Sequence, residues 1–180
     1  FLYCLIRSLK PRVVIETGVL HGLTSAWILK ALDDNNLGRL ISIDLPRRDW
    51  DKYFEGIEFG DGGDAEFEIK EETPGWVIPE NLKSKWELFL GPSSKYLQGL
   101  CKTEDNIDLF IHDSDHSYDT MQIECELIQK YHPSSTIVID DYYVNNFAFD
   151  FQKTTGRNLF EIDDVSDALK VTKGCALLDV

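Results

Sequence analysis

The sequence is short of cysteines and of basic residues, and both shortages exclude classes of protein. Its 180 residues include four cysteines, which are far apart and form no Cys-x-x-Cys pair. A zinc site or a dense disulfide framework is therefore disfavoured, and we expect reduced, buried thiols in a cytoplasmic protein. Lys and Arg number 18 against 32 for Asp and Glu, which gives a formal net charge of −14. This balance argues against nucleic acid and against an anionic membrane surface as partners.

Long apolar runs are also absent, since none approaches the roughly 18 residues that a membrane span needs. The sequence begins with Phe1 and not with Met, and no signal-like segment precedes it. We therefore expect the natural N-terminus to be truncated. Hydrophobic residues make up 43% and aromatic residues 12% of the chain, which is enough for a packed core. The length predicts a single domain over residues 1–180.

Negative charge is concentrated in one segment, at about residues 46–85. Ten acidic and four basic residues lie between positions 46 and 72, together with four glycines and no sustained periodicity. This composition predicts an acidic insertion or lid over the packed core. We expect about residues 49–79 to be the most mobile part of the domain and to border the substrate pocket.

Short β-branched runs alternate with stretches of helical apolar spacing along the rest of the chain. The predicted strands are 13–15, 40–44, 86–90, 107–111 and 136–139, with two weaker ones near 159–162 and 175–180. The predicted helices are 23–32, 93–100, 118–131 and 145–153. Such alternation implies right-handed crossovers between parallel strands. We predict an α/β fold: a Rossmann-like, doubly wound, mostly parallel seven-stranded sheet with helices on both faces.

Acidic or hydroxyl side chains follow four of the predicted strands: Glu16, Thr17, Asp44, Asp113, Asp140 and Asp141. In an open parallel sheet, ligands bind outside the carboxyl ends of the strands. Carboxylates at the ends of buried strands are costly unless something there compensates their charge. A binding site at this edge is one interpretation, and solvated loop caps or helix N-caps are the other.

The turn after the first strand contains two glycines, Gly18 and Gly22, which allow positive φ angles and close approach to a ligand. The helix that follows offers unpaired amide groups. Leu20 and Leu23 stand where the dinucleotide pattern Gly-x-Gly-x-x-Gly needs glycine, which disfavours a nicotinamide cofactor. Asp44 ends the next strand 22 residues after Gly22. There a carboxylate can accept both hydroxyls of a ribose, or it can cap a turn.

Four segments together resemble the class I S-adenosylmethionine-dependent methyltransferases. They are Glu16-Thr-Gly-Val-Leu-His-Gly-Leu-Thr-Ser25, Ser42-Ile-Asp-Leu-Pro46, Ile111-His-Asp-Ser-Asp-His-Ser-Tyr118 and Ile139-Asp-Asp141. The third segment resembles a branch that contains small-molecule and sugar O-methyltransferases and cephalosporin hydroxylase-like proteins. The resemblance covers roughly the whole chain. It implies an enzyme that transfers a methyl group to a hydroxyl of a small molecule.

The resemblance also implies where the cofactor S-adenosylmethionine binds. In the family the first turn holds the methionine part, and the acid after the second strand holds the ribose. The matching cofactor-binding residues here are Glu16, Thr17, Gly18, Gly22, Ser25, Asp44, Ser93 and Asp113. Near the adenine the family commonly has Gly-Asp-Ser, where this chain has Gly91-Pro92-Ser93. The usual acidic contact is therefore missing.

A second group of residues would hold a divalent metal ion. Mg²⁺ and other hard cations prefer oxygen ligands, and the predicted metal ligands are Asp113, Asp140 and Asp141. Some similar macrolide sugar methyltransferases bind a metal on the matching acids, with a histidine three positions after the first as base. This similarity implies that Asp113 and His116 are catalytic. Alternatively, Asp115 or Ser117 caps the helix that follows, and His116 only packs against the turn.

Two other functions remain open at this point. A metal-dependent hydroxylase would need a face of two histidines and one carboxylate, and His112, Asp113 and His116 lie too close along one strand end for this. We expect His112 to be a packed histidine. A catalytically silent domain would bind the cofactor without turnover. The methyl acceptor stays open, and so does the oligomeric state, with a homodimer among the options.

Overall fold

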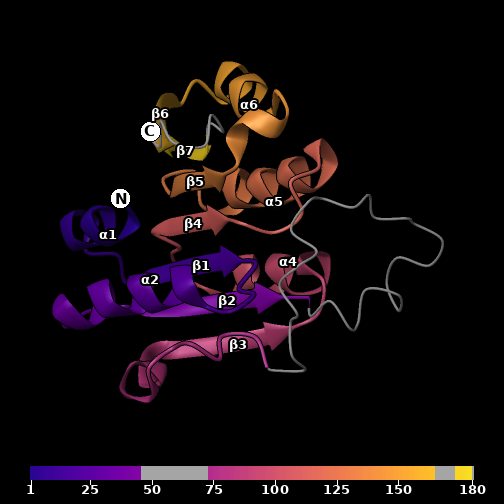
Figure 1. Cartoon of the computed structure of the whole chain (residues 1–180). Coiled ribbons are helices and arrows are strands. Elements are labelled where there is room, and N and C mark those ends of the chain that lie inside the picture. The colour runs from indigo at the N-terminus through magenta and orange to yellow at the C-terminus, as the bar shows by residue number, and fades with distance from the viewer. Residues whose placement is uncertain (46–72, 165–172, 180) are drawn as a thin grey trace.

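Seven strands form one sheet in the computed structural model, which describes residues 1–45, 73–164 and 173–179 (Figure 1). They are β1 (Val13–Thr17), β2 (Arg39–Asp44), β3 (Trp86–Leu90), β4 (Leu109–His112), β5 (Thr136–Asp140), β6 (Asn158–Asp164) and β7 (Lys173–Asp179). Their order in the sheet is β3-β2-β1-β4-β5-β7-β6. The first five strands are parallel, and β7 is antiparallel to both β5 and β6. The predicted mostly parallel, seven-stranded sheet is confirmed.

Helices cover both faces of the sheet, as predicted. One face carries α1 (Leu2–Leu9), α2 (Leu23–Asp34) and the 3₁₀ helix η2 (Glu80–Lys85). The other carries α4 (Ser93–Thr103), α5 (Tyr118–Tyr131) and α6 (Phe147–Thr155), and a short 3₁₀ turn, η3 (Tyr142–Val144), follows β5. Because strand side chains alternate between faces, Val14 packs on the α1–α2 side and Ile15 on the α4–α6 side. No helix in the described parts of the chain is long and apolar enough to cross a membrane.

The chain reverses the direction in which it adds strands between β1 and β4. It adds β2 and then β3 on one side of β1, and β4 and β5 on the other side. The loops that leave the carboxyl ends of β1 and β4 therefore diverge, and open sheets of this kind bind ligands at such a point. In Figure 1 the parallel strands point to the right, so this edge lies on the right-hand side of the molecule.

The acidic insertion is only partly covered, because residues 46–72 lie outside the described residues. The mobility that we expect for residues 49–79 therefore stays a prediction. The described part, residues 73–85, forms a turn followed by η2. Two backbone amides of this turn donate hydrogen bonds to carbonyl oxygens of the loop after β1. The turn is thus attached to the edge of the sheet where the predicted site residues lie.

Candidate functional site

The loop after β1 passes directly over the end of β4, and two glycines make this possible. Gly18 has φ +85°, and a Cβ atom at this position would lie 1.8 Å from the backbone oxygen of Asp113. Gly22 has φ +89°, and a Cβ atom there would lie 2.6 Å from Cα of Gly75. Glycine alone fits either position without strain. The predicted cofactor turn and the predicted catalytic residue Asp113 are therefore in backbone contact.

Replacing Gly18 by Ala is expected to lower the free energy of unfolding by about 2–4 kcal/mol, because backbone strain and overpacking both oppose a methyl group there. Urea denaturation measures this loss. Gly99→Ala in α4 is the matched control, since nothing lies within 4 Å of its Cβ position. It should be neutral or stabilise the helix by up to about 1 kcal/mol. Equal stability of the two variants would contradict the close contact between Gly18 and Asp113.

Glu16, in β1, is fully buried. Its Oε2 atom accepts hydrogen bonds from the hydroxyls of Ser25 (2.6 Å) and Ser42 (2.8 Å), and Trp86 Nε1 donates to Ser42 Oγ at 2.9 Å. Its Oε1 atom is buried without a hydrogen-bond partner among the described residues. Burial raises the pKa of Glu16 to about 7, although the two serine hydroxyls act to lower it. A buried acceptor without a partner at this edge indicates a place for a donor group of a ligand.

Glu16 should make the free energy of unfolding fall as pH rises. Its pKa is about 7 in the folded protein against an ordinary 4.5, so the folded state holds this proton more tightly. The resulting stabilisation is complete below about pH 4.5 and is lost as pH rises through about 7. The loss amounts to about 3 kcal/mol. We expect the difference in free energy of unfolding between wild type and Glu16→Gln to change by this amount over that pH range, as measured by urea denaturation without ligand. Both proteins keep the neighbouring Asp44. A difference that does not change with pH would contradict the raised pKa.

Asp44, at the end of β2, is only 9% exposed and binds the loop after β1. Its Oδ1 atom accepts hydrogen bonds from the backbone amides of Val19 (2.8 Å) and Leu20 (3.2 Å). Burial raises the pKa of Asp44, against the two amides, which lower it. Both amides bind Oδ1, so Oδ2 takes no part in capping the turn.

Three hydroxyls among the predicted cofactor-binding residues form hydrogen bonds with buried carboxylates. One is the hydroxyl of Ser25, which donates to Glu16. Thr17 Oγ1 donates to Oε2 of Glu124, on α5, at 2.7 Å, and Ser93, at the start of α4, also forms a hydrogen bond with Glu124. These hydroxyls therefore join neighbouring elements of the sheet edge to one another.

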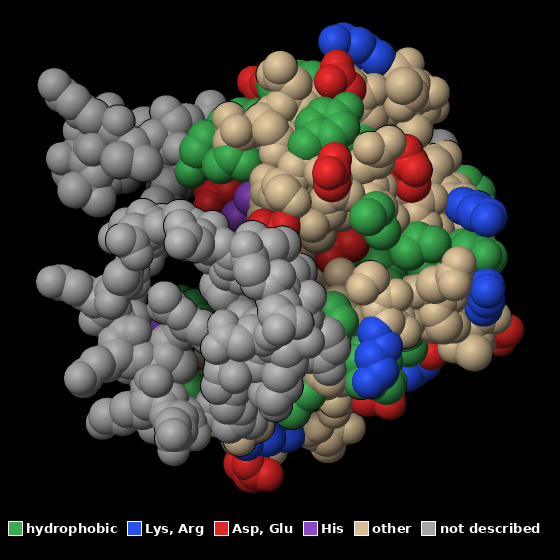
Figure 2. Space-filling model, turned by 90° about the vertical axis from the view of Figure 1, so that its right-hand side faces the viewer, with side chains coloured by type: hydrophobic (Ala, Val, Ile, Leu, Met, Phe, Trp, Pro, Cys, Tyr) green, Lys and Arg blue, Asp and Glu red, His purple; other side chains and the backbone are tan. Residues whose placement is uncertain are grey.

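Among the described residues, Asp113, His116 and Asp140 form a group that could bind a metal ion. One potential ligand atom from each lies within 4.8 Å of the others. The carboxyl groups of Asp113 and Asp140 lie close enough to interact directly. Burial and the charges of Asp140 and Glu16 raise the pKa of Asp113 well above its ordinary value, and a nearby cation would offset this repulsion. Figure 2, which views this edge, shows a histidine beside acidic side chains.

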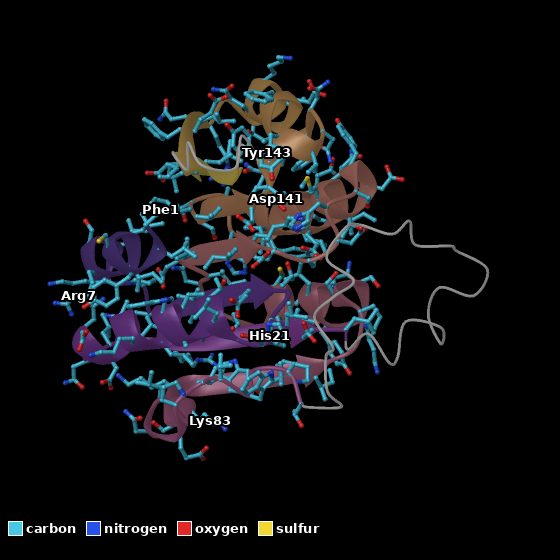
Figure 3. The ribbon with its side chains drawn as sticks, in the orientation of Figure 1. Phe1, Arg7, His21, Lys83, Asp141 and Tyr143 are labelled. Carbon is cyan, nitrogen blue, oxygen red and sulfur yellow. The ribbon has the colours of Figure 1, made fainter. Side chains whose placement is uncertain are left out.

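Asp141 lies beside this group of three and contacts its histidine. Its backbone is left-handed, with φ 47°. Its Oδ1 atom accepts a hydrogen bond from the hydroxyl of Tyr143 at 2.9 Å, and its Oδ2 atom lies 3.9 Å from Nε2 of His116. Figure 3 shows Asp141 and Tyr143 together near the end of β5. Of the three predicted metal ligands, the structure thus brings Asp113 and Asp140 together and sets Asp141 against the predicted base.

His116, in the loop between β4 and α5, packs edge-to-face on the ring of His112. The ring centroids are 5.5 Å apart and the planes cross at 79°. The Nδ1 atom of His116 is buried without a hydrogen-bond partner among the described residues, and Asn145 Nδ2 donates to its carbonyl oxygen at 2.9 Å. Burial, together with His112, lowers the pKa of His116 despite the nearby acids. The neutral ring is thereby favoured, and a neutral imidazole can accept a proton or bind a metal.

The capping alternative is correct for the two residues on either side of His116. Ser117 is the N-cap of α5, and its Oγ atom accepts a hydrogen bond from the amide of Thr120 at 3.3 Å. Asp115 Oδ2 accepts hydrogen bonds from the hydroxyls of Ser117 and Thr120 at 2.5 and 2.8 Å. Asp115 and Ser117 therefore build the start of the helix, while His116 lies against Asp141.

The sequence analysis missed Glu124, although a signal was present. Glu124 is 1% exposed and shares the buried face of α5 with Met121 and Ile128. Helix positions three and four apart lie on one face, so an acid in register with these two apolar residues indicates a buried carboxylate. Tyr143 and Asn145 were also missed, and no pattern in the sequence indicates them. The packed state expected for His112 is confirmed, since this residue is fully buried.

Comparison with known proteins connects this geometry to a family. The family profile described as "Methyltransferase domain" matches residues 15–142. The O-methyltransferase from Bacillus cereus, in complex with SAH (S-adenosylhomocysteine), is 17% identical with a TM-score of 0.70, and the match covers 100% of this chain and 79% of that one. The O-methyltransferase TomG from Streptomyces achromogenes, involved in tomaymycin synthesis and solved with SAM, is 18% identical with a TM-score of 0.67, over 99% and 77% of the two chains. At these identities the likeness is one of fold. No curated protein matches the sequence.

Proposed function

We propose that this chain, which belongs to the methyltransferase domain family, transfers a methyl group from S-adenosylmethionine to a hydroxyl of a small molecule. The observation that carries the proposal is the meeting of two sets of groups at one sheet edge. The glycine turn follows β1. Beside it lie the Oε1 atom of Glu16, which has no partner among the described residues, and the carboxylate of Asp44 at the end of β2. The Asp113–His116–Asp140 group lies beside it, in backbone contact through Gly18.

The residues around the turn fit this cofactor. Glu16 Oε1, buried and without a partner among the described residues, suits the ammonium group of the methionine part, because a buried carboxylate needs a donor. Asp44 Oδ2 suits a ribose hydroxyl. Gly18 and Gly22 let the backbone approach the ligand. Thr17, Ser25 and Ser93 would support these contacts from behind, since their hydroxyls already bind Glu124 and Glu16.

A divalent cation fits the second group, because hard cations prefer carboxylate oxygens and the charge of Asp140 raises the pKa of Asp113. Asp113, Asp140 and Asp141 would hold it. When bound, such a cation would lower the pKa of the acceptor hydroxyl. A hydroxylase is less well supported, because the group contains one histidine and two aspartates and not the two histidines which that chemistry prefers.

In this proposal, Nε2 of His116 accepts the proton from the acceptor hydroxyl. The methyl group leaves a sulfonium and bonds to the acceptor oxygen, so the enzyme must align the two and remove this proton. Asp141, 3.9 Å from Nε2, would stabilise the imidazolium that forms. The net charge of −14 favours a neutral or cationic acceptor over a polyanionic one. The His112–Tyr118 segment supports the cephalosporin hydroxylase-like branch, as it does in the sequence alone.

Binding of SAH tests the cofactor assignment. Asp44→Ala should weaken SAH binding by about 1.5–3 kcal/mol, the usual cost of losing hydrogen bonds to a charged group. Asp44→Asn distinguishes the roles of the two carboxylate oxygens. The carbonyl oxygen of Asn can still accept hydrogen bonds from the loop amides, whereas an NH₂ group replaces the other oxygen. Calorimetry should give weaker binding for both variants, unchanged binding for the exposed control Asp105→Ala, and no binding of NAD. Equal SAH affinity in wild type and Asp44→Ala would refute the ribose assignment.

A further inference from the structure

Glu124 is a buried carboxylate that has no role in the proposed reaction. It lies on α5, 1% exposed, and four side chains contact it. Its Oε2 atom accepts a hydrogen bond from Thr17 Oγ1 at 2.7 Å and lies 2.8 Å from Nδ1 of His112. Its Oε1 atom accepts from Ser114 Oγ at 3.1 Å, and Ser93 forms a further hydrogen bond with it. Such burial is costly for a carboxylate unless donors surround it.

These donors keep Glu124 ionised. Burial raises its pKa, but the hydrogen bond and electrostatic attraction of His112 and the hydroxyls of Ser93 and Thr17 outweigh this effect and leave the pKa below its ordinary value. An ionised carboxylate only accepts hydrogen bonds, so Nδ1 of His112 must carry the hydrogen. The other ring nitrogen of His112 is buried without a partner among the described residues. Within the described part of the chain, Glu124 therefore supplies the hydrogen bond that orients this ring.

The four contacts come from different elements around one edge. Thr17 ends β1, Ser93 begins α4, His112 ends β4, and Ser114 lies in the loop after β4. Thr17 directly precedes Gly18, and His112 directly precedes Asp113, and the backbones of Gly18 and Asp113 are in contact. The ring of His112 in turn packs against that of His116. Glu124 therefore binds both sides of the junction between the cofactor turn and the Asp113–His116 segment.

We propose that Glu124 is a positioning residue that holds the cofactor turn and the Asp113–His116 segment in one fixed arrangement. The inference rests on the proposed function, because it assumes that the turn binds the cofactor. One oxygen, Oε2, holds Thr17 on β1 and His112 on β4. A relative displacement of about 1 Å between these strand ends would break one of these bonds or lengthen both of them. Displacements of this size also cost catalysis about 10²-fold, so a rigid junction would keep methyl donor and base aligned.

Packing alone does not explain an acid at this position. An apolar residue would fill the same space next to Met121 and Ile128 without the cost of a buried charge. A carboxylate matches the surrounding donors because all its hydrogen-bonding positions are acceptors. Gln has nearly the same shape, but it would turn a donor toward some of these groups. Glu124→Gln therefore tests the hydrogen bonds while it keeps the volume.

The first test compares Glu124→Gln with Glu126→Gln, an exposed acid on the same helix whose carboxylate accepts a hydrogen bond from Gln122. SAH affinity is measured by calorimetry well below the melting temperature, where circular dichroism shows the variants to be folded. Imidazole ¹H–¹⁵N spectra report the environment of His116. We expect Glu124→Gln to weaken SAH binding about 10–100-fold and to shift the His116 signals. Glu126→Gln should change neither. A folded Glu124→Gln protein with wild-type affinity and unchanged His116 signals would overturn the proposal.

A second test uses Thr17 and does not depend on the folding of Glu124→Gln. Thr17→Val removes the hydroxyl and keeps the shape, whereas Thr17→Ser keeps the hydroxyl. We expect Thr17→Val to weaken SAH binding and Thr17→Ser to bind as wild type does. The double variant of Thr17→Val with Glu124→Gln should bind no more weakly than Glu124→Gln alone, because both changes remove one shared bond. Equal binding by Thr17→Val and Thr17→Ser would refute the positioning role. A wild-type protein that does not bind SAH would instead refute the proposed function on which the inference rests.

Discussion

Replacing His116 by Gln is expected to lower methyl-transfer turnover about 10²–10⁴-fold, the usual contribution of a positioned general base. Gln keeps the approximate size of the side chain but cannot take a proton. His116 is not among the proposed cofactor-binding residues, so the affinity for SAH should not change. The assay follows radiolabelled methyl transfer to a hydroxyl acceptor found by screening, and calorimetry follows SAH binding on the same samples.

His132→Gln provides the control for this experiment. His132 is buried and its Nε2 atom lies 2.9 Å from the carbonyl oxygen of Cys101. This contact is with α4, and the residue directly follows α5, away from the carboxyl edge. The variant should lose stability and keep its turnover per folded molecule. A turnover rate in His116→Gln equal to that of wild type would refute the assignment of His116 as the base, whatever the result for the control.

Chelation of divalent cations is expected to abolish most of the turnover. Asp113 and Asp140 bring two carboxyl groups into direct contact, and this repulsion is relieved by a proton or by a cation. Excess EDTA should therefore stop methyl transfer, and added Mg²⁺ or Mn²⁺ should restore it. Full activity in excess EDTA would eliminate the cation from the mechanism.

Direct binding of Mn²⁺ separates the cation site from catalysis. Asp140→Asn and Asp141→Asn should each weaken Mn²⁺ binding about 10–100-fold, as followed by calorimetry and by the electron paramagnetic resonance of free Mn²⁺. Asp150→Asn on α6 is the control, because this acid pairs with Lys153 on the surface. If Asp141→Asn binds Mn²⁺ as tightly as the control does, Asp141 is not a ligand and acts only on His116.

Much of the fold can be predicted because burial imposes a period on the sequence. The predicted ranges for β3 and α5 coincide with those observed, since each element has a clear apolar pattern and a turn or cap at one end. Helix α1 was not predicted, because it has eight residues and only Ile6 is fully buried. The start of β4 was placed two residues early. Ile107 is buried like a strand residue, but the strand begins only after Asp108. The Oδ2 atom of Asp108 accepts hydrogen bonds from the backbone amides of residues 12 and 13.

The site was predictable as far as it depends on strand ends. Parallel strands bring their final residues to one edge, so the acids that follow them had to lie near one another. Two features depend on tertiary structure and could not be predicted. Asp141 has a left-handed backbone, and its Oδ2 atom lies 3.9 Å from Nε2 of His116. Glu124 meets Thr17 across 107 positions of sequence, and helical periodicity carries no information about a partner so distant.

The pair formed by β1 and β4 is where the N-terminal part of the sheet meets its C-terminal part. Strands β1 to β3 come from residues before 91 and strands β4 to β7 from residues after 108. Among the described strands, only the β1–β4 pair joins the two sets. The cofactor turn belongs to the first part, and Asp113, His116 and Asp140 belong to the second. A chain cut in the loop between α4 and β4 would thus yield two fragments, neither with a complete active site. Methyl transfer would return only when the fragments reassociate, which makes this fold suitable for a split-enzyme complementation assay.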